Sequence, residues 1–464
     1  MKSGKIHAAN EFYALAFGLF LGLCILKFGD PVILDQKISP PHSLSEAFQY
    51  SWPTHWANWI LWPLAIIGAF LIVPRIRLLP CPLWLLVLPL PWLGWQIVSA
   101  TQSVDSFLTA TALWQFFGCV ASYFIGLFLF KTPRAFHLLL IGVMTAFTIC
   151  LIRAIQQKSE FPASQHALLE GQRTGWTNFP PAMIVEMKQD QTIIATNGMD
   201  VVNPAIMAKF AKGRVMGTMV YPNALAGLIL LLFPVSLVLA FSGAKKLRPL
   251  VRGPAIFLAL ALGLAAFFWS GSKFGWLIAM AIGGLCLFRL NWPVKLKILA
   301  VVAVAIVGLG AFAIRFHSYF EHGATSATAR LDYWRAAVQI TRSHPLFGTG
   351  PGTFQRPYAV IKSPDAEMAR LAHNDYLEQF CDSGLPGGLF YVIWIAATLV
   401  FAGRKLWTSR DSVIVATGLG LFAWFIQGLG EFELYIPALA WTAFALLGYL
   451  IARAESVRQK PAAR

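Results

Sequence analysis

The chain has 464 residues, of which 57% are hydrophobic and 12% are charged, and its mean hydropathy is +0.62. A soluble globular domain usually carries about 25% charged residues, so this composition excludes one. The formal net charge is +16. The basic residues lie in short segments between apolar runs, which argues against nucleic-acid binding and favours contact with anionic membrane lipids.

Apolar runs of about 18–20 residues recur along the chain, which is the length that a helix needs to cross a membrane. We therefore predict an all-α, polytopic membrane protein with about twelve transmembrane helices, folded as a single integral membrane domain over residues 1–464. The predicted spans are 11–29, 56–73, 81–99, 111–130, 135–152, 217–241, 254–270, 274–290, 298–314, 384–402, 412–430 and 436–453.

The Lys and Arg residues are concentrated on one side of these spans. With the N-terminus in the cytoplasm, that side carries 20 cations and three acids, and the other side carries the remaining 17 cations and 18 acids. The positive-inside rule then predicts that both termini are cytoplasmic, including the polar tail 454–464.

Two connections on the outer side are much longer than the others, at 153–216 and 315–383. Loops of this length are usually functional, and we expect both to contain short helices. In the second loop, helical spacing predicts a helix over 328–342, which ends at His344-Pro345 because a residue before proline avoids the α conformation. A further helix is predicted over 364–381, with Ser363 as its N-cap.

Three glycines, Gly348, Gly350 and Gly352, lie between these two predicted helices. They look like a phosphate-binding loop, but no strand precedes them and no Lys-Ser/Thr pair follows them. We favour a backbone turn that needs glycine. The alternative is that their N–H groups contact an anion.

His373 is the histidine best placed for chemistry, as a general base or hydrogen-bond donor. On the helix predicted over 364–381 it would share a face with Tyr376, and Asn374 and Glu378 would be neighbours four residues apart. The alternative for a single loop histidine is a structural or merely exposed side chain. The histidines and the six cysteines show no metal-binding spacing, so we predict no metal site.

The long loops also hold arginines, among them Arg214, Arg330 and Arg335. A guanidinium fork can grip a phosphate with two hydrogen bonds, whereas an arginine at the end of a span is more often an interfacial anchor. Asn223 lies near the outer end of the sixth span. A polar group there is either functional or the N-cap of a helix that starts after Pro222.

Three blocks of sequence within residues 210–400 form a recognisable pattern. They are Arg214-Val-Met-Gly217 with Pro222-Asn223-Ala224; Arg330-Leu-Asp-Tyr-Trp334 with His344-Pro345-Leu346-Phe347-Gly348; and Ala372-His373-Asn374-Asp375-Tyr376-Leu377 with Asp382-Ser383-Gly384. In this order they resemble the O-antigen ligase and polymerase superfamily of bacterial inner-membrane glycosyltransferases.

The resemblance implies transfer of a glycan from an undecaprenyl-pyrophosphate carrier to an acceptor, at the periplasmic face and without a metal or other cofactor. The acceptor would be a glycan, a lipid A core or another molecule. By resemblance Arg214 and Arg330 match arginines that hold the pyrophosphate, and His373 matches the catalytic histidine. Lys273 stands where the family commonly has Arg, so it keeps a charge and loses the planar fork.

We also expect five residues to contact substrate: Asn223, Lys273, Asn374, Glu378 and Arg335. The sequence leaves open whether the chain is a ligase or a repeat-unit polymerase of the same superfamily. Two other classes compete with both: a transporter or flippase of lipid-linked glycans, and a structural scaffold. Ion-coupled transport normally needs ionisable residues within the spans, and Lys27 and His137 are the nearest exceptions here.

Overall fold

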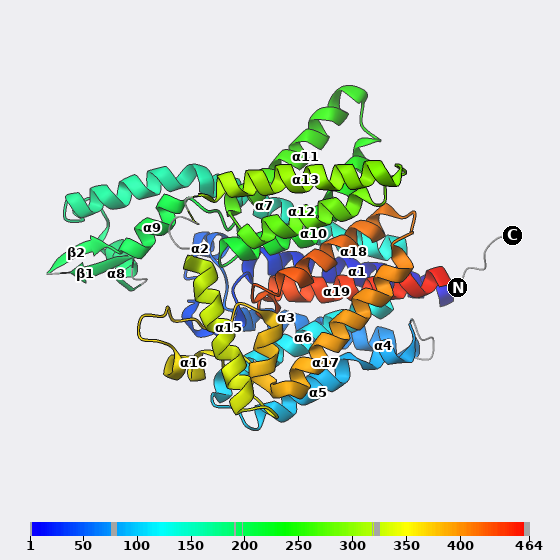
Figure 1. The fold of residues 1–464 in the computed structure, drawn as a ribbon, viewed down its shortest axis with the longest axis horizontal. Helices are drawn as coiled ribbons and strands as arrows, with labels where there is room; N and C mark the ends of the chain where they lie inside the picture. The colour runs from blue at the N-terminus through cyan, green and yellow to red at the C-terminus, as the bar shows by residue number, and fades with distance from the viewer. Residues whose placement is uncertain are drawn as a thin grey trace.

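The computed structural model describes residues 2–75, 81–189, 192–196, 198–317, 319 and 325–458. It is 76% helical and has almost no strands, which confirms the predicted all-α class. Figure 1 shows long helices in a bundle, with the start of α1 (Lys2–Lys27) and the end of α19 (Pro437–Arg458) at the right. A small lobe with β1 (Ile193–Thr196) and β2 (Met199–Val202) lies at the far left, and α15 (Thr325–Ser343) lies left of centre.

The elements follow in chain order. The helices are α1 (Lys2–Lys27), α2 (Leu44–Gln49), α3 (Thr54–Ile72), α4 (Leu83–Val87), α5 (Pro89–Ala100), α6 (Ser106–Leu129), α7 (Pro133–Arg173), α8 (Pro181–Gln189), α9 (Pro204–Lys212), α10 (Pro222–Ala244), α11 (Pro249–Ser270), α12 (Lys273–Leu287), α13 (Val294–Arg315), α15 (Thr325–Ser343), α16 (Gln355–Ile361), α17 (Asp375–Leu406), α18 (Ser412–Gln427) and α19 (Pro437–Arg458). Three 3-10 turns are η1 (Val32–Lys37), η2 (Val73–Arg75) and η3 (Glu433–Tyr435), and two strands are β1 (Ile193–Thr196) and β2 (Met199–Val202).

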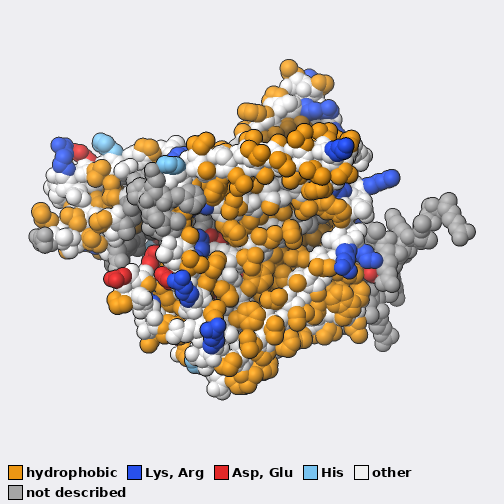
Figure 2. Space-filling view, in the orientation of Figure 1, with side chains coloured by type: hydrophobic (Ala, Val, Ile, Leu, Met, Phe, Trp, Pro, Cys, Tyr) orange, Lys and Arg blue, Asp and Glu red, His pale blue; other side chains and the backbone are white. Residues whose placement is uncertain are grey.

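Within the described residues, ten helices are long and apolar enough to cross a membrane, and α12 and α18 are shorter apolar helices. Each of the twelve predicted spans overlaps one of these twelve segments. Figure 2 shows the matching surface: a broad hydrophobic area covers the middle of the molecule, and most of the visible Lys and Arg side chains lie beyond its two ends. The chain is therefore a multi-pass membrane protein.

Helix α19 is at the centre of the bundle, and α13 is at its edge. In the most apolar stretch of α19, 94% of the residues are buried within the protein, whereas in that of α13 none are. Glycines let α6 approach α19 closely: a Cβ at Gly126 would lie 2.0 Å from the carbonyl oxygen of Ala445, and one at Gly448 would lie 2.0 Å from that of Tyr123. Small residues at such crossings allow tight packing between membrane helices.

The segment predicted as a first loop, 153–216, starts as a continuation of a membrane helix. Helix α7 has 41 residues and ends only at Arg173. At about 1.5 Å per residue it is about 62 Å long, roughly twice the thickness of a hydrocarbon core. Beyond it, α8, the antiparallel β1–β2 hairpin and α9 form a small lobe around Leu168, Trp176, Ile193 and Val202.

In the second long segment, α15 confirms the helix predicted over 328–342, and the helix predicted over 364–381 is wrong. Helix α17 begins at Asp375, and its N-cap is Asn374, not Ser363. The Asn374 side chain accepts hydrogen bonds from the N–H groups of Tyr376 and Leu377. An asparagine in this position satisfies N–H groups that a helix start leaves without partners, which fixes the start of α17 there.

Helix α17 is bent at Ser383 and Gly384, where the backbone leaves the helical region and Gly384 has φ of 69°. A Cβ at Gly384 would lie 2.3 Å from the carbonyl oxygen of Leu346, so only glycine fits at this contact. The bend separates a first segment, which follows the α15–α16 region, from the membrane-crossing segment. It lies at the start of the span predicted over 384–402.

Candidate active site

A buried carboxylate, Glu431, is the centre of the candidate site. It lies between α18 and η3, and its side chain is 1% exposed. Four side chains contact its two carboxylate oxygens, and they come from segments far apart in the sequence: Tyr221, Asn223, Arg330 and His373. A buried charge needs such partners because it has lost its hydration.

Arg330 supplies the direct counter-charge from α15. Its Nη2 lies 2.5 Å from Oε1 of Glu431, and its side chain is 19% exposed. The Nε atom of the same guanidinium is buried and has no hydrogen-bond partner within the part of the chain that the structure describes. Arg330 therefore has donor capacity that Glu431 does not use.

Arg214 reaches the same centre through Asn223. Its Nη2 donates to Oδ1 of Asn223 at 2.6 Å, and Nδ2 of Asn223 donates to Oε1 of Glu431 at 2.7 Å. Asn223 is in the first turn of α10, whose N-cap is Tyr221, so the reading of Asn223 as an N-cap is wrong. Its amide instead joins an arginine to a carboxylate.

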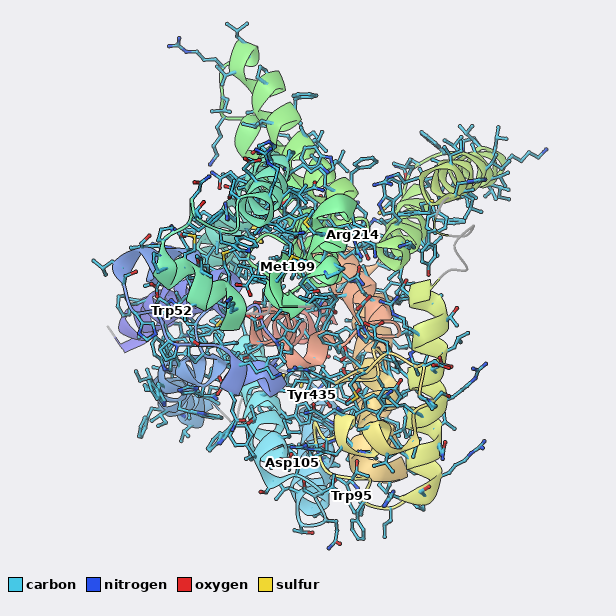
Figure 3. All side chains as sticks on the ribbon, turned by 90° about the vertical axis from the view of Figure 1, so that its left-hand side faces the viewer. Trp52, Trp95, Asp105, Met199, Arg214 and Tyr435 are labelled. Carbon is cyan, nitrogen blue, oxygen red and sulfur yellow. The ribbon has the colours of Figure 1, made fainter. Side chains whose placement is uncertain are left out.

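The Arg214 segment is held at both sides by α7. Nζ of Lys158 donates to the carbonyl oxygen of Gly213 at 3.1 Å, and Nε2 of Gln157 donates to that of Gly217 at 2.8 Å. Nε of Arg214 also donates to the carbonyl oxygen of Ser270 at 2.7 Å. Figure 3 looks onto this end of the molecule and shows Arg214 lying, in projection, between the lobe and α15.

His373 is in the loop before α17 and not on a helix, contrary to the prediction. Its φ is 51°, an uncommon conformation for a residue other than glycine. Its Nδ1 lies 3.4 Å from Oε2 of Glu431, and its ring packs between Tyr333 and Phe432, with centroid distances of 5.8 Å and 4.6 Å. The side chain is 27% exposed, so part of the ring is accessible.

The contact with Glu431 fixes the tautomer of His373. An ionised carboxylate only accepts hydrogen bonds, so Nδ1 carries a proton when it faces Glu431. In the neutral ring Nε2 is then an acceptor, which is the form that a general base needs. A histidine oriented by a carboxylate through one nitrogen, with the other nitrogen free to act, is a recurrent catalytic arrangement.

Electrostatics keep Glu431 ionised. Burial raises the pKa of the Glu431 carboxyl. The charge of Arg330 and the contacts with His373 and Tyr221 lower this pKa by more than burial raises it, so it lies below the ordinary value. Burial also lowers the pKa of the Arg214 guanidinium, which Glu431 partly opposes. The pKa of Tyr221 is raised well above its ordinary value, by burial first and then by Glu431, so its hydroxyl remains a donor.

Lys273 lies at the edge of this cluster as the first residue of α12. Its Nζ lies 4.0 Å from the ring centroid of Tyr319 and 5.2 Å from that of Phe316. Two residues earlier, Gly271 packs against Arg214: a Cβ there would lie 3.2 Å from Nε of Arg214. Lys273 therefore adds a third cation near the site without contacting Glu431.

Three predicted contact residues lie outside the cluster. The Asn374 side chain is used as the N-cap of α17. Glu378 is buried and accepts a hydrogen bond from the backbone N–H of Ala372. Arg335 is 75% exposed and pairs with Asp332 on the same helix. Of the eight predicted residues, Arg214, Asn223, Arg330 and His373 come together, and Lys273 is adjacent.

The glycine turn is confirmed, and its N–H groups contact a carboxyl side chain and a backbone carbonyl of the protein itself. Gly348, Gly350 and Gly352 have φ of 66°, 103° and 74°. The N–H of Gly352 donates to Oδ2 of Asp382 at 2.6 Å, and the N–H of Gly350 donates to the carbonyl oxygen of Asp382 at 2.8 Å. These N–H groups therefore attach the turn to α17, and they do not face Glu431.

Asp382 also belongs to a buried group with Glu378 and Cys381. Their ligand atoms lie within 4.8 Å of one another, so by residue type they could hold a metal ion. Asp382 already accepts from Tyr435 and Gly352, at 2.6 Å each. Acidic groups of this kind are common without a metal, and we assign none here.

The sequence analysis did not single out Glu431, because it is one of 18 acidic residues on the predicted outer side. Its position in the sequence could have indicated its role. Glu431 lies in a short connection between two apolar spans, Gly430-Glu431-Phe432-Glu433. So short a connection cannot carry a charged side chain far from the helix ends. An acid in that position therefore needs a buried partner.

Fold and cluster together define a multi-pass membrane protein with a cationic site centred on a carboxylate. The site is at the end of the bundle opposite to the start of α1 and the end of α19. Residues 258–392 match the family model described as O-antigen ligase, which confirms the resemblance to that superfamily. The matched segment contains Lys273, Arg330 and His373. Arg214 and Asn223 precede it, and Glu431 follows it.

One curated relative is an uncharacterized protein of Haemophilus influenzae. It is 26% identical over 197 residues, which cover 38% of this chain and 49% of that protein. The chain thus spans about half the length of the curated relative it matches.

Proposed function

We propose that this protein transfers a glycan from an undecaprenyl-pyrophosphate carrier to an acceptor at the periplasmic face of the bacterial inner membrane, as an O-antigen ligase would. The observation that carries the proposal is the convergence of Arg214, Arg330 and His373 on the buried Glu431. The site adjoins the ends of membrane helices, where the pyrophosphate of a membrane-embedded lipid would lie.

In the proposed reaction, an acceptor hydroxyl oxygen attacks the anomeric carbon of the donor. The bond from that carbon to the pyrophosphate oxygen breaks, and the lipid pyrophosphate leaves with the electron pair. The hydroxyl proton passes to Nε2 of His373. Arg330 and Arg214 stabilise the negative charge that develops on the leaving group. No metal is required in this scheme because guanidinium groups meet that charge.

Glu431 acts in this scheme as a positioning residue. It holds Nδ1 of His373 in the protonated form, so that Nε2 is directed to the acceptor. It also fixes the guanidinium of Arg330, whose Nε is without a partner in the described structure. A preorganised site of this kind needs little rearrangement when charge develops.

The proposed orientation follows from charge. The connections α10–α11, α12–α13 and α17–α18 carry most of the described Lys and Arg residues at the end where α1 begins and α19 ends, and the positive-inside rule puts that end in the cytoplasm. The two termini would then be cytoplasmic. The lobe and the Glu431 site would face the periplasm, where lipid-linked glycans and no nucleotides are present.

A repeat-unit polymerase of the same superfamily is the alternative, because it would use the same residues with a glycan as acceptor. A flippase is the alternative from another class. It would move the lipid-linked glycan across the membrane and leave the bond to pyrophosphate intact.

The test is reconstitution of the purified protein with a lipid-linked glycan donor and with separate lipid A core and glycan acceptors. We expect transfer by the wild type, in the presence of EDTA as well. His373→Ala should lower the rate about 100-fold or more, and Arg330→Ala should lower it about 100-fold. The matched controls are Arg342→Ala, an exposed arginine of α15, and His42→Ala, an exposed histidine.

Full transfer by both site variants would overturn the site assignment. Transfer only to a glycan acceptor would select the polymerase. Translocation of an intact donor in vesicles, without transfer to either acceptor, would select the flippase.

A further inference from the structure

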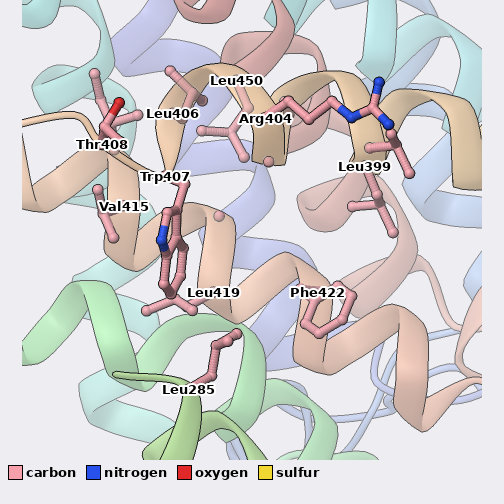
Figure 4. A pocket seen from close by; sticks show the side chains of 15 residues that line it. Leu285, Leu399, Arg404, Leu406, Trp407, Thr408, Val415, Leu419, Phe422 and Leu450 are labelled. Atoms are coloured by element: carbon pink, nitrogen blue, oxygen red, sulfur yellow. The ribbon is translucent and has the colours of Figure 1, made fainter. Parts of the chain in front are cut away.

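A cavity lies at the other end of the bundle from Glu431. Its volume is about 540 Å³, and it is formed by residues of α12, α17, α18 and α19, among them Leu285, Trp407, Ile414, Gly418 and Leu450. Figure 4 shows Trp407 along one side of this cavity, Leu285 from α12 below it and Phe422 from α18 at the other side.

This cavity is separate from the candidate active site. Ile414, near the start of α18, lines the cavity, whereas Gln427, at the end of α18, donates hydrogen bonds to the carbonyl oxygen of Asn223 and to Glu433. Gln427 is 13 positions after Ile414, which corresponds to about 20 Å of helix. A ligand in the cavity would therefore lie near the opposite ends of the spans.

The lining selects an aliphatic ligand. Most of the fifteen lining residues are apolar, and Arg404 and Thr408 are the polar ones apart from the indole N–H of Trp407. A site for a soluble metabolite places several polar groups inside to fix orientation. Here the interior offers apolar surface to a chain of methylene groups, and the volume is in the usual range of ligand sites, about 300–1,000 Å³.

The rim supplies positive charge. Arg404 lines the cavity and is exposed, and among the described residues it forms no hydrogen bond or ion pair. Arg289 is different, because it donates to the carbonyl oxygens of Trp407 and Ser409 and thereby holds the turn after α17. Arg404 is thus the cation at the rim that remains available to an anionic group, with Lys405 beside it.

We propose that this cavity binds one anionic phospholipid of the adjacent leaflet, with an acyl chain between α17 and α18 and the phosphate on Arg404. The apolar lining accounts for the chain, and the unpaired guanidinium accounts for the anionic head. A membrane with anionic lipids at this basic end provides such a ligand directly. This inference concerns a site distinct from the one in the proposed function and does not depend on that reaction.

The experiment is native mass spectrometry of the full chain released from detergent, with phosphatidylglycerol or phosphatidylcholine added at equal concentration. We expect one phosphatidylglycerol to be retained per chain and phosphatidylcholine to be retained about fivefold less. Arg404→Gln should abolish this preference. Gly403→Leu should reduce retention of both lipids, because a Cβ at Gly403 meets open space and a longer side chain would fill the cavity.

The matched controls are Arg248→Gln and Gly253→Leu, an exposed arginine and an unhindered glycine at the same end of the bundle but outside the cavity. Both should bind phosphatidylglycerol as the wild type does. Equal retention of the two lipids by the wild type would overturn the proposal, as would an unchanged preference in Arg404→Gln. Displacement of phosphatidylglycerol by an equal amount of undecaprenyl phosphate would also overturn it, and would assign the cavity to the carrier lipid.

Discussion

Two glutamates, Glu431 and Glu433, lie two residues apart, are both buried, and differ in their charge state. Glu431 faces Arg330 and His373, and its pKa lies below the ordinary value. Glu433 is buried next to Asp375 and Glu431, and the pKa of its carboxyl is raised well above the ordinary value, by burial first. Its partners thus hold the first as an ion, whereas burial and two acidic neighbours favour the neutral form of the second.

Because of this difference, replacing each glutamate by glutamine should have different effects on the stability of the protein. Glu431→Gln leaves Arg330 buried without its counter-ion and should destabilise the protein by about 3 kcal/mol at pH 7. Glu433→Gln resembles the neutral acid and should change stability by less than about 1 kcal/mol. The measurement is the denaturant midpoint in detergent, with the exposed Glu367→Gln as a further control.

The pH dependence of the same comparison follows from linkage. A carboxyl with a lowered folded pKa contributes stability above its unfolded pKa, about 4.3, and loses it as the pH falls through the folded pKa. The free energy of unfolding that Glu431→Gln loses relative to the wild type should therefore be constant from pH 8 to about 5 and shrink below about 4. A deficit that disappears between pH 7 and 6 would show that Glu431 is not the ionised partner of Arg330.

At the scale of elements, the sequence predicted α15 and the glycine turn, and the resemblance to a family singled out Arg214, Arg330 and His373. The start of α17 was predicted wrongly. Periodicity alone extended a helix back to 364. The helix instead begins after Asn374, whose side chain accepts hydrogen bonds from two N–H groups, and the preceding His373 has a left-handed conformation. Short-range capping of this kind is invisible to an apolar repeat.

The glycine turn follows α15 and packs against the backbone of α17 at Asp382, so it leaves no room for a side chain. A Cβ at Gly348 would lie 2.4 Å from backbone atoms of Asp382, and its φ is 66°. We expect Gly348→Ala to destabilise the protein by more than about 1–3 kcal/mol, the cost of the backbone conformation alone. The measurement is the denaturant midpoint. Gly253→Ala, where a Cβ meets open space, is the control and should be close to wild type.

At the scale of the whole molecule, the apolar runs located the membrane helices because burial in lipid imposes a minimum length. They did not predict the lobe, because α7 continues as a polar helix to Arg173 with no apolar signal. They also did not reveal which helix is central. The positions of α19 and α13 depend on side-chain fit between helices, such as Gly126 against Ala445, which hydropathy does not encode.

The proposed orientation can be tested by labelling single cysteines in a cysteine-free background. Ser363→Cys, in the exposed loop between α16 and α17, should react with a membrane-impermeant maleimide in cells whose outer membrane alone is permeabilised. Lys246→Cys, exposed between α10 and α11, should react only after the inner membrane is also opened. The reverse pattern would invert the topology and move the Glu431 site to the cytoplasm.

The length of α7 gives the lobe a mechanical connection to the membrane site. Pro162 removes one hydrogen bond inside α7 without ending the helix, so a tilt of a few degrees at the membrane displaces its far end by several Å. Near the point where this helix leaves the bundle, Gln157 and Lys158 hold the backbone on either side of Arg214. We therefore expect a displacement of the lobe to shift the backbone that carries the Arg214 guanidinium.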